Sequence, residues 1–197
     1  MRNKSNEIEI YRSLRKRIEL SNPQDKVISI ISNNSGDGKT DLTYKLGQSF
    51  AKSGKKVLLL DGNLRQPDLS MNLAKEDNNY IDSLLENKAN IDSLTTSTDY
   101  ENLYILPSQK SIDNSTEILE SQIIKNIIEE ARKDFDYLII DTLSLSEGMD
   151  GIILGELSDG VIYITVENKS KVKMIEEYKT ILEEADIKLI GAIYKKG

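Results

Sequence analysis

The chain has 197 residues, contains neither Cys nor His, and carries a formal net charge of −7. Its length suits one compact domain over residues 1–197, and the missing Cys and His exclude thiol nucleophiles, disulfides, Ser-His-Asp triads and the usual zinc ligands. The negative charge disfavours binding to nucleic acid, so we expect no such partner. No N-terminal apolar run resembles a signal peptide or a membrane span, and we expect a soluble, cytoplasmic chain.

A basic segment opens the chain and is predicted to form a helix. The helical pattern runs from Asn6 to Leu20 within residues 1–22, and the segment SNPQD ends it. Glu9, Arg12 and Arg15 are spaced three apart, so they line one side of this helix. Two interpretations stay open: an intrahelical ion pair of little energetic value, or a contact surface for another molecule.

Six apolar runs of strand length follow, separated by patterns of helical spacing. The runs are rich in Val and Ile and do not alternate with polar residues, which is typical of strands covered on both faces. The patterns Ile118 to Ala131 and Val172 to Ala185 each place one apolar stripe on a helix. Residues 62–101 predict a long loop region with one or two short helices, such as IDSLLE. The strand-like runs are Val27–Ile31, Val57–Leu60, Leu103–Leu106, Tyr137–Ile140, Val161–Val166 and Leu189–Tyr194.

This alternation of strands and helices predicts an α/β fold, a doubly wound, mostly parallel sheet flanked by helices. In such sheets ligands bind beyond the carboxyl ends of the strands. The residues that follow each strand are therefore the first place to look for function.

A glycine-rich turn joins the first strand to a helix. The phosphate-loop pattern G-x-x-x-x-G-K-[ST] fits Asn33–Thr40, with Asn33 in the first glycine position. Asn tolerates a left-handed backbone better than other non-glycine residues, so we expect that conformation at Asn33. Gly36 and Gly38 let successive backbone N–H groups turn toward phosphate oxygens. The predicted phosphate-binding residues are Ser35, Gly36, Asp37, Gly38, Lys39, Thr40 and Asp41.

Within this loop, Lys39 is predicted to reach the β- and γ-phosphates, and the Thr40 hydroxyl is predicted to face Mg²⁺. The alternative is a glycine-rich turn that caps an ordinary helix, with Lys39 pointing at water. A lysine at the positive start of a helix is unfavourable unless an anion is bound, which favours phosphate binding. Asp37 and Asp41 could partly supply that negative charge, so the alternative stays open.

Two further strand ends carry acidic residues. Asp61 directly follows the run Val57–Leu60, and Asp141 directly follows Tyr137–Ile140. Either carboxylate alone could cap a turn. Beside a phosphate loop, Asp141 suits a contact with metal-bound water, and Asp61 suits either that role or acceptance of a proton from an attacking hydroxyl. The predicted metal site thus contains Thr40, Asp61 and Asp141.

Together these motifs resemble those of the bacterial tyrosine kinases, the BY-kinases that regulate capsule and exopolysaccharide assembly. The phosphate loop, LLLDGNLRQP and LIIDT match the family's Walker A, Walker A′ and Walker B motifs in order, and ENLYILPS and NSTEIL resemble further segments. The resemblance covers nearly the whole chain. It implies a P-loop fold and transfer of the γ-phosphoryl group of ATP, with Mg²⁺, to protein tyrosines. Lys39 would stabilise charge and Asp61 would position the nucleophile.

The resemblance also implies partners. Glu9, Arg12 and Arg15 fit the family's E-x-x-R-x-x-R motif, which serves ring-like self-association, so a homo-oligomer is expected. Family members without a membrane span are activated by the cytosolic tail of a separate membrane protein. This chain is therefore expected to be recruited to the inner face of the membrane, where it meets substrate tyrosines.

The chain departs from the family pattern at several positions. Asn63 stands where the Walker A′ motif usually has a second acid, and an amide cannot serve as a base. Leu143 and Ser144 replace two prolines after the Walker B motif, and Ser115 replaces another proline. Of the tyrosines that usually cluster near the end, only Tyr194 is present.

Two other functions therefore stay open. The chain could be a nucleotide-binding regulatory relative, a pseudokinase that acts with a membrane partner without efficient phosphoryl transfer. It could also be a switch like the partition and division-site ATPases. The signature lysine of those ATPases would fall at Asn34, which makes the switch the weaker alternative.

Overall fold

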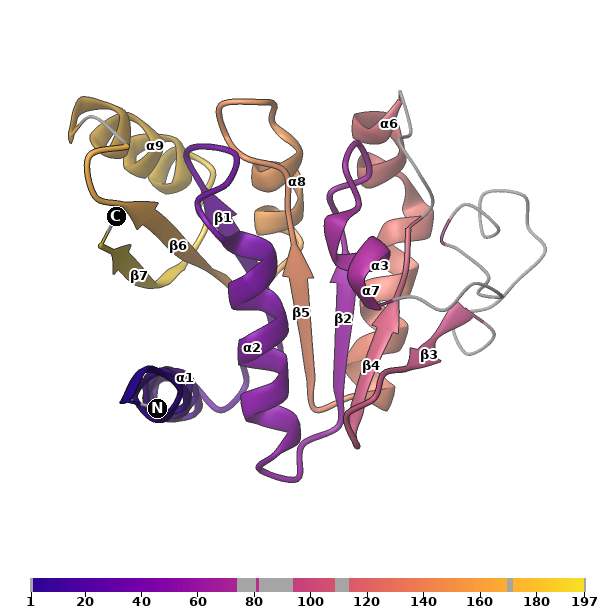
Figure 1. Cartoon of the computed structure of the whole chain (residues 1–197). Coiled ribbons are helices and arrows are strands. Elements are labelled where there is room, and N and C mark those ends of the chain that lie inside the picture. The colour runs from indigo at the N-terminus through magenta and orange to yellow at the C-terminus, as the bar shows by residue number, and fades with distance from the viewer. Residues whose placement is uncertain (1, 74–80, 82–93, 109–113, 170–171, 197) are drawn as a thin grey trace.

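A computed structural model describes residues 2–73, 81, 94–108, 114–169 and 172–196 (Figure 1). The strands in these residues form one seven-stranded sheet in the order β3-β4-β2-β5-β1-β6-β7. All pairings are parallel except that of β3 with β4. The strands are β1 (Val27–Ser32), β2 (Val57–Asp61), β3 (Thr96–Ser97), β4 (Leu103–Leu106), β5 (Tyr137–Asp141), β6 (Gly160–Val166) and β7 (Leu189–Lys195).

Helices cover both faces of the sheet, which confirms the predicted architecture. One face packs against α1 (Arg2–Ser21), α2 (Lys39–Ala51) and α3 (Asp68–Leu73). The other face packs against α6 (Ser115–Glu120), α7 (Gln122–Asp134) and α8 (Asp150–Glu156), while α9 (Val172–Glu184) packs beside β6. Among the described residues, no helix combines the length and the apolar character needed to cross a membrane.

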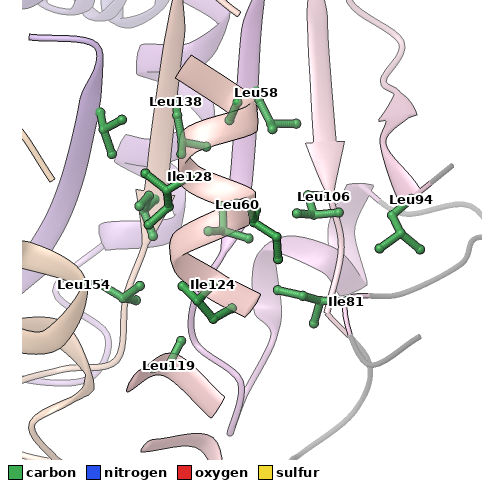
Figure 2. Packing of buried hydrophobic residues seen from close by; sticks show 14 of the residues in the cluster. Leu58, Leu60, Ile81, Leu94, Leu106, Leu119, Ile124, Ile128, Leu138 and Leu154 are labelled. Carbon is green, nitrogen blue, oxygen red and sulfur yellow. The ribbon is translucent and has the colours of Figure 1, made fainter. Parts of the chain in front are cut away.

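The central strands β1, β2, β5 and β6 are buried on both faces because helices cover both sides of them. Leu58 and Leu60 of β2 lie in one cluster with Ile124 of α7 (Figure 2). Leu59, between them, lies in the cluster on the other side with Phe50 of α2. All five residues are almost completely buried. Continuous apolar runs, rather than alternating ones, are the expected pattern for such strands.

The six predicted strands and the N-terminal helix are confirmed, but one predicted helix is divided in the structure and two elements were not predicted. The stripe from Ile118 to Ala131 is divided between α6 and α7, because Ser121 has an extended backbone (ψ 158°) that breaks the helix. The short polar strand β3 and helix α8 were not predicted. Except for Ile81, the segment IDSLLE lies outside the described residues.

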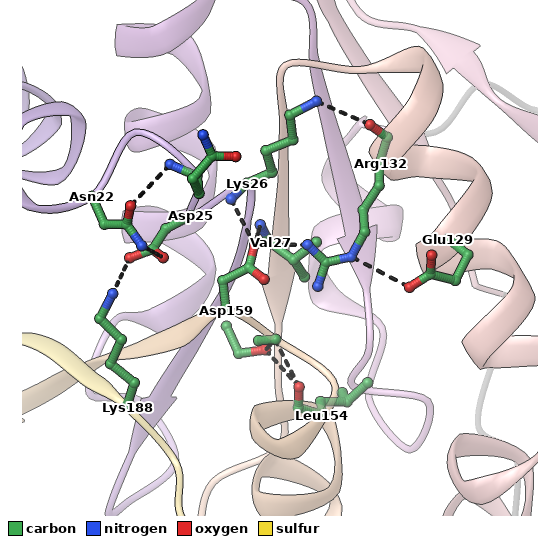
Figure 3. Close-up of polar contacts among 12 residues, drawn as sticks. Asn22, Asp25, Lys26, Val27, Glu129, Arg132, Leu154, Asp159 and Lys188 are labelled. Atoms are coloured by element: carbon green, nitrogen blue, oxygen red, sulfur yellow. Dashed lines mark hydrogen bonds and ion pairs between the residues drawn. The ribbon is translucent and has the colours of Figure 1, made fainter.

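A carboxylate holds several loops together at the amino ends of the strands (Figure 3). Asp159 Oδ2 accepts hydrogen bonds from the backbone N–H groups of Lys26 (2.6 Å) and Val27 (2.8 Å) and from Arg132 Nη1 (2.8 Å). One side chain therefore links the start of β1, the end of α7 and the turn before β6. Burial raises the pKa of Asp159, but Arg132 and the two amides outweigh it and hold the pKa below 3.8.

Replacement of this carboxylate should destabilise the domain. We expect Asp159→Ala to lower the free energy of unfolding by about 2 to 3 kcal/mol, because two amides and a guanidinium lose their acceptor. Glu129→Ala, which removes an exposed partner 3.5 Å from the same arginine, should cost no more than about 0.5 kcal/mol. Urea unfolding measures both. Because the native pKa of Asp159 is depressed, the effect of Asp159→Ala should shrink as the pH falls from about 5 to about 2. Equal costs for the two variants would contradict this role.

Candidate nucleotide site

The phosphate-loop pattern lies where the sheet topology predicts a ligand site. Residues 33–40 connect the carboxyl end of β1 to α2, next to the ends of β5 and β2 (Figure 1). Gly36 and Gly38 have φ angles of 72° and 98°, in the left-handed region. Side chains rarely adopt that region, so glycine at both positions allows the backbone to turn its N–H groups inward.

The prediction of a left-handed Asn33 is wrong, since its φ is not positive. Asn33 is instead fully buried, and its side-chain Oδ1 accepts a hydrogen bond from the Tyr163 hydroxyl of β6. The first position of the loop therefore anchors it to the neighbouring strand through a side chain. A backbone without positive φ needs no glycine there.

Lys39 is buried at the base of the loop and does not point at water, which contradicts that part of the alternative. Its ammonium donates to Ser32 Oγ (2.9 Å) and Ser144 Oγ (3.1 Å), and the residue is 7% exposed. Burial lowers the pKa of Lys39, while the nearby Asp141 carboxylate opposes that shift. The site thus holds a cation directly below the glycine-rich turn.

Two carboxylates lie side by side next to this cation. Asp61 and Asp141 are direct partners in the register of β2 and β5. Asp141 Oδ2 accepts a hydrogen bond from Thr40 Oγ1 (2.6 Å), and Asp61 Oδ2 accepts two from the Ser70 backbone and hydroxyl (both 2.7 Å). The remaining oxygen of each carboxylate is buried without a partner in the described part of the chain.

These unpaired oxygens fit a divalent cation. Mg²⁺ prefers carboxylate and hydroxyl oxygens, keeps several waters and takes further oxygens from a nucleotide, so few protein ligands are needed. Across the described ranges, no group of three or more Asp, Glu, His or Cys residues could hold a metal alone. The donor set of Asp61, Asp141 and Thr40 therefore suits Mg²⁺ bound together with phosphate oxygens.

The paired carboxylates have perturbed acidity. Burial, followed by repulsion from Asp141, raises the pKa of Asp61 to about 8. Burial also raises the pKa of Asp141 to about 6, although Thr40 and Lys39 act in the opposite direction. Two buried like charges on adjacent strands are unfavourable without a counter-ion.

The remaining predicted loop residues lie in different surroundings. Asp37 is buried, and its Oδ2 accepts the Asn34 N–H (3.1 Å), so this carboxylate braces the turn. Asp41 is exposed and forms an ion pair with Lys45 (3.0 Å). Ser35 lines the cavity above the loop.

That cavity has a volume of about 600 Å³ and extends beyond the residues that the motifs predicted. Its far wall comes from the segment after β2 and from α3, whose position depends on packing and could not be read from the motifs. The sequence contains one indication of this wall, because the segment that forms it directly follows the end of the strand Val57–Asp61. The unpredicted lining residues are Tyr44, Asn63, Gln66, Asp68, Leu69, Asn72, Leu73 and Ser144.

A second network, also unpredicted, supports this wall. Arg65 Nε donates to Ser115 Oγ (2.9 Å), and Ser115 donates to Asp150 Oδ2 (2.9 Å). Asp150 is fully buried and also lies 3.4 Å from Arg65 Nε. The segment after β2 is thereby tied to the first turns of α6 and α8.

The three charged residues predicted for self-association do not share one environment. Glu9 and Arg12 are exposed and lie 3.9 Å apart. Arg15 is buried against Glu19, with its Nη1 2.6 Å from Glu19 Oε1. Arg12 and Arg15 line a separate cavity of about 510 Å³ between α1 and α2.

Comparison with known proteins gives consistent matches. A family model described as an AAA domain matches residues 25–188. The chain is 31% identical to the tyrosine-protein kinase CpsD of Streptococcus pneumoniae over 189 residues, which cover 95% of this chain and 83% of CpsD. It is 31% identical to the tyrosine-protein kinase YwqD of Bacillus subtilis over 192 residues, which cover 96% of this chain and 81% of YwqD.

Solved structures show the same fold. The kinase domain of the Escherichia coli tyrosine kinase ETK has a TM-score of 0.88 at 19% identity, covering 96% of this chain and 75% of ETK's. The cell division ATPase MinD of Pyrococcus furiosus has a TM-score of 0.74 at 23% identity, covering 86% of this chain and 71% of MinD's. These matches confirm the predicted P-loop fold.

The paired carboxylates should make stability depend on pH. Raised pKa values mean that the native state holds protons that the unfolded state has lost, so this contribution to stability falls as the pH rises toward about 8. Asp61→Asn removes the carboxyl group whose pKa is raised to about 8, so the variant loses less stability as the pH rises. Without metal, we expect the original chain to lose more of its unfolding free energy than Asp61→Asn between about pH 6 and about pH 8. The difference in unfolding free energy, that of Asp61→Asn minus that of the original chain, should therefore increase over this range. Thermal unfolding in metal-free buffers measures it, and a constant difference would contradict the assignment.

Proposed function

The chain belongs to the AAA-domain family and, within it, to the bacterial tyrosine kinases, and from this we propose that it transfers the γ-phosphoryl group of ATP to protein tyrosines in capsular or exopolysaccharide biosynthesis. One observation carries the proposal. Buried Lys39 lies below a left-handed glycine turn, beside the paired carboxylates of Asp61 and Asp141. A buried ammonium, a glycine turn and two adjacent carboxylates at one edge of the sheet support the binding of phosphates and a metal there.

In this proposal each residue has a separate task. The backbone N–H groups of residues 35–40 bind the phosphates, and Lys39 stabilises charge on the β- and γ-phosphates. Thr40, Asp61 and Asp141 hold Mg²⁺, which neutralises charge on the phosphate oxygens when it is bound. The alternative role for Asp61 is to accept the proton of the tyrosine hydroxyl with the same unpaired oxygen, Mg²⁺ then being held by Thr40 and Asp141.

One observation favours a second candidate, a regulatory relative that binds nucleotide with little transfer. Asn63 lines the nucleotide cavity, and its neutral amide can act neither as a base nor as a charged metal ligand. The third candidate, a partition-type ATPase switch, is supported only by the fold shared with MinD. Both remain outcomes of the assay below.

The proposal includes partners. By family resemblance, the kinase is cytoplasmic, is recruited to the inner face of the membrane by the cytosolic tail of a membrane protein, and forms a homo-oligomer. For the oligomer we assign the contact to Glu9 and Arg12, because both side chains are about two-thirds exposed on α1. Arg15 contributes indirectly by fixing α1 through Glu19.

Phosphotransfer can be tested with labelled ATP, Mg²⁺ and a tyrosine-rich acceptor, with and without the cytosolic tail of a membrane partner. We expect label on tyrosine, and a loss of at least about 100-fold with Lys39→Ala or Asp61→Asn, since each removes charge stabilisation or the base. Lys133→Ala, an exposed lysine on α7, is the matched control and should keep full activity. Nucleotide binding without label would support the regulatory relative, and phosphate release alone would support the switch.

Self-association can be tested by measuring the solution mass by light scattering. We expect an oligomer whose mass falls to that of the monomer with Glu9→Ala and Arg12→Ala combined, because the exposed charges then lose their partners on the neighbouring copy. Arg17→Ala removes another exposed arginine of α1 and should leave the mass unchanged. The contact is assigned wrongly if the double variant keeps the oligomer.

A further inference from the structure

The Lys39 ammonium is held by two hydroxyl groups from separate segments. Ser32, the last residue of β1, accepts from Nζ at 2.9 Å, and Ser144, in the loop between β5 and α8, accepts at 3.1 Å. Both serines are at most 1% exposed. An ammonium group has three protons. In the described residues, these two contacts leave one proton of Lys39 for another acceptor.

Each serine has its own proton directed away from the lysine. Ser32 Oγ donates to the backbone carbonyl of Asn34 (2.9 Å), and Ser144 Oγ donates to Glu147 Oε2 (2.5 Å). A hydroxyl offers one proton and two lone pairs. Because both protons are engaged elsewhere, both oxygens present lone pairs to Nζ. The direction of the two bonds is therefore set by Asn34 and Glu147.

Backbone hydrogen bonds fix the loop that carries Ser144. Leu145 N–H donates to the Ser32 carbonyl and Ser146 N–H donates to the Asn33 carbonyl, both at 2.9 Å. Glu147 N–H donates back to the Ser144 carbonyl at 2.9 Å. The loop is thus joined to the phosphate loop at two points. The position of Ser144 relative to Lys39 is set by the backbone and not by side-chain rotation alone.

We propose that Ser144, oriented by Glu147, is a positioning residue that aims Lys39 at the phosphates of the bound nucleotide. In this relay of Glu147, Ser144 and Lys39, Ser144 accepts one ammonium proton of the lysine. Ser32 accepts the second, and the third is left for a phosphate oxygen. Ser144 also lines the nucleotide cavity, so the relay reaches the site from its wall. This inference rests on the proposed function, because it assigns a role within the nucleotide site.

The exposed Glu147 makes the relay testable without disturbing the core. Ser144→Ala removes the acceptor beside Lys39, and Glu147→Ala removes the group that orients it. Glu147→Gln keeps an acceptor oxygen at the same place and is the conservative rescue. Ser146→Ala alters an exposed serine of the same loop and is the matched control.

Affinity for ATP with Mg²⁺, measured by calorimetry on the full chain, tests the proposal, together with the melting temperature of each variant. We expect Ser144→Ala and Glu147→Ala each to weaken ATP binding about tenfold, the effect of one charge-assisted hydrogen bond. Glu147→Gln and Ser146→Ala should bind within about twofold of the original chain, and the melting temperature of Glu147→Ala should be unchanged.

Two results would overturn the inference alone. One is ATP affinity in Glu147→Ala equal to that of the original chain. The other is an ATP affinity of Glu147→Gln as low as that of Glu147→Ala. That result would assign the effect to the charge of Glu147 and not to its orientation of the Ser144 hydroxyl. Failure of the original chain itself to bind ATP would overturn the proposed function, so the two failures are distinguishable.

Discussion

Three neighbouring parallel strands, β2, β5 and β1, end at the same edge of the sheet, and their ends bring one buried cation and two buried carboxylates together. Parallel pairing places Asp61 opposite Asp141, and the loop after β1 places Lys39 beside them. Isolated buried charges are costly, so each of these groups needs a partner. Lys39 has Ser32 and Ser144, and Asp141 has Thr40. The two carboxylate oxygens that have no partner in the described residues are the feature on which the proposed metal and phosphate site rests.

The site depends on a scaffold whose two faces are both covered. The central strands β1, β2, β5 and β6 are buried along their whole length, and the charged groups of the site appear where β2 and β5 end and in the loop after β1. Side-chain hydrogen bonds hold the loops at that edge: Tyr163 bonds Asn33, Ser70 bonds Asp61 within the segment after β2, and Ser115 and Asp150 bond Arg65. The phosphate loop, the segment after β2 and the segment after β5 thereby become one framework. In such a framework a nucleotide meets donors that are already in place.

Local signals predicted most elements and the first layer of the site. Apolar runs predicted six strands, and the glycine spacing predicted the phosphate loop with Lys39 and Thr40. Local reasoning failed where a residue's role depends on a distant partner. Asn33 was assigned a left-handed backbone, but its side chain is fixed by Tyr163. The single stripe around Ser121 was predicted as one helix, because periodicity alone does not reveal a one-residue break. Ser144, a departure from the family pattern, is a direct partner of Lys39.

By itself, the sequence determined most of the elements, the glycine-rich turn after the first strand, and the acids that end two strands. These properties follow from backbone preferences and from side-chain spacing over a few residues. Only the tertiary structure decided that β5 lies between β2 and β1, so that Asp61 and Asp141 are adjacent and Lys39 meets Ser144. Strand order and loop contacts arise from packing between segments as far apart as residues 39 and 144. No pattern within one segment contains that information.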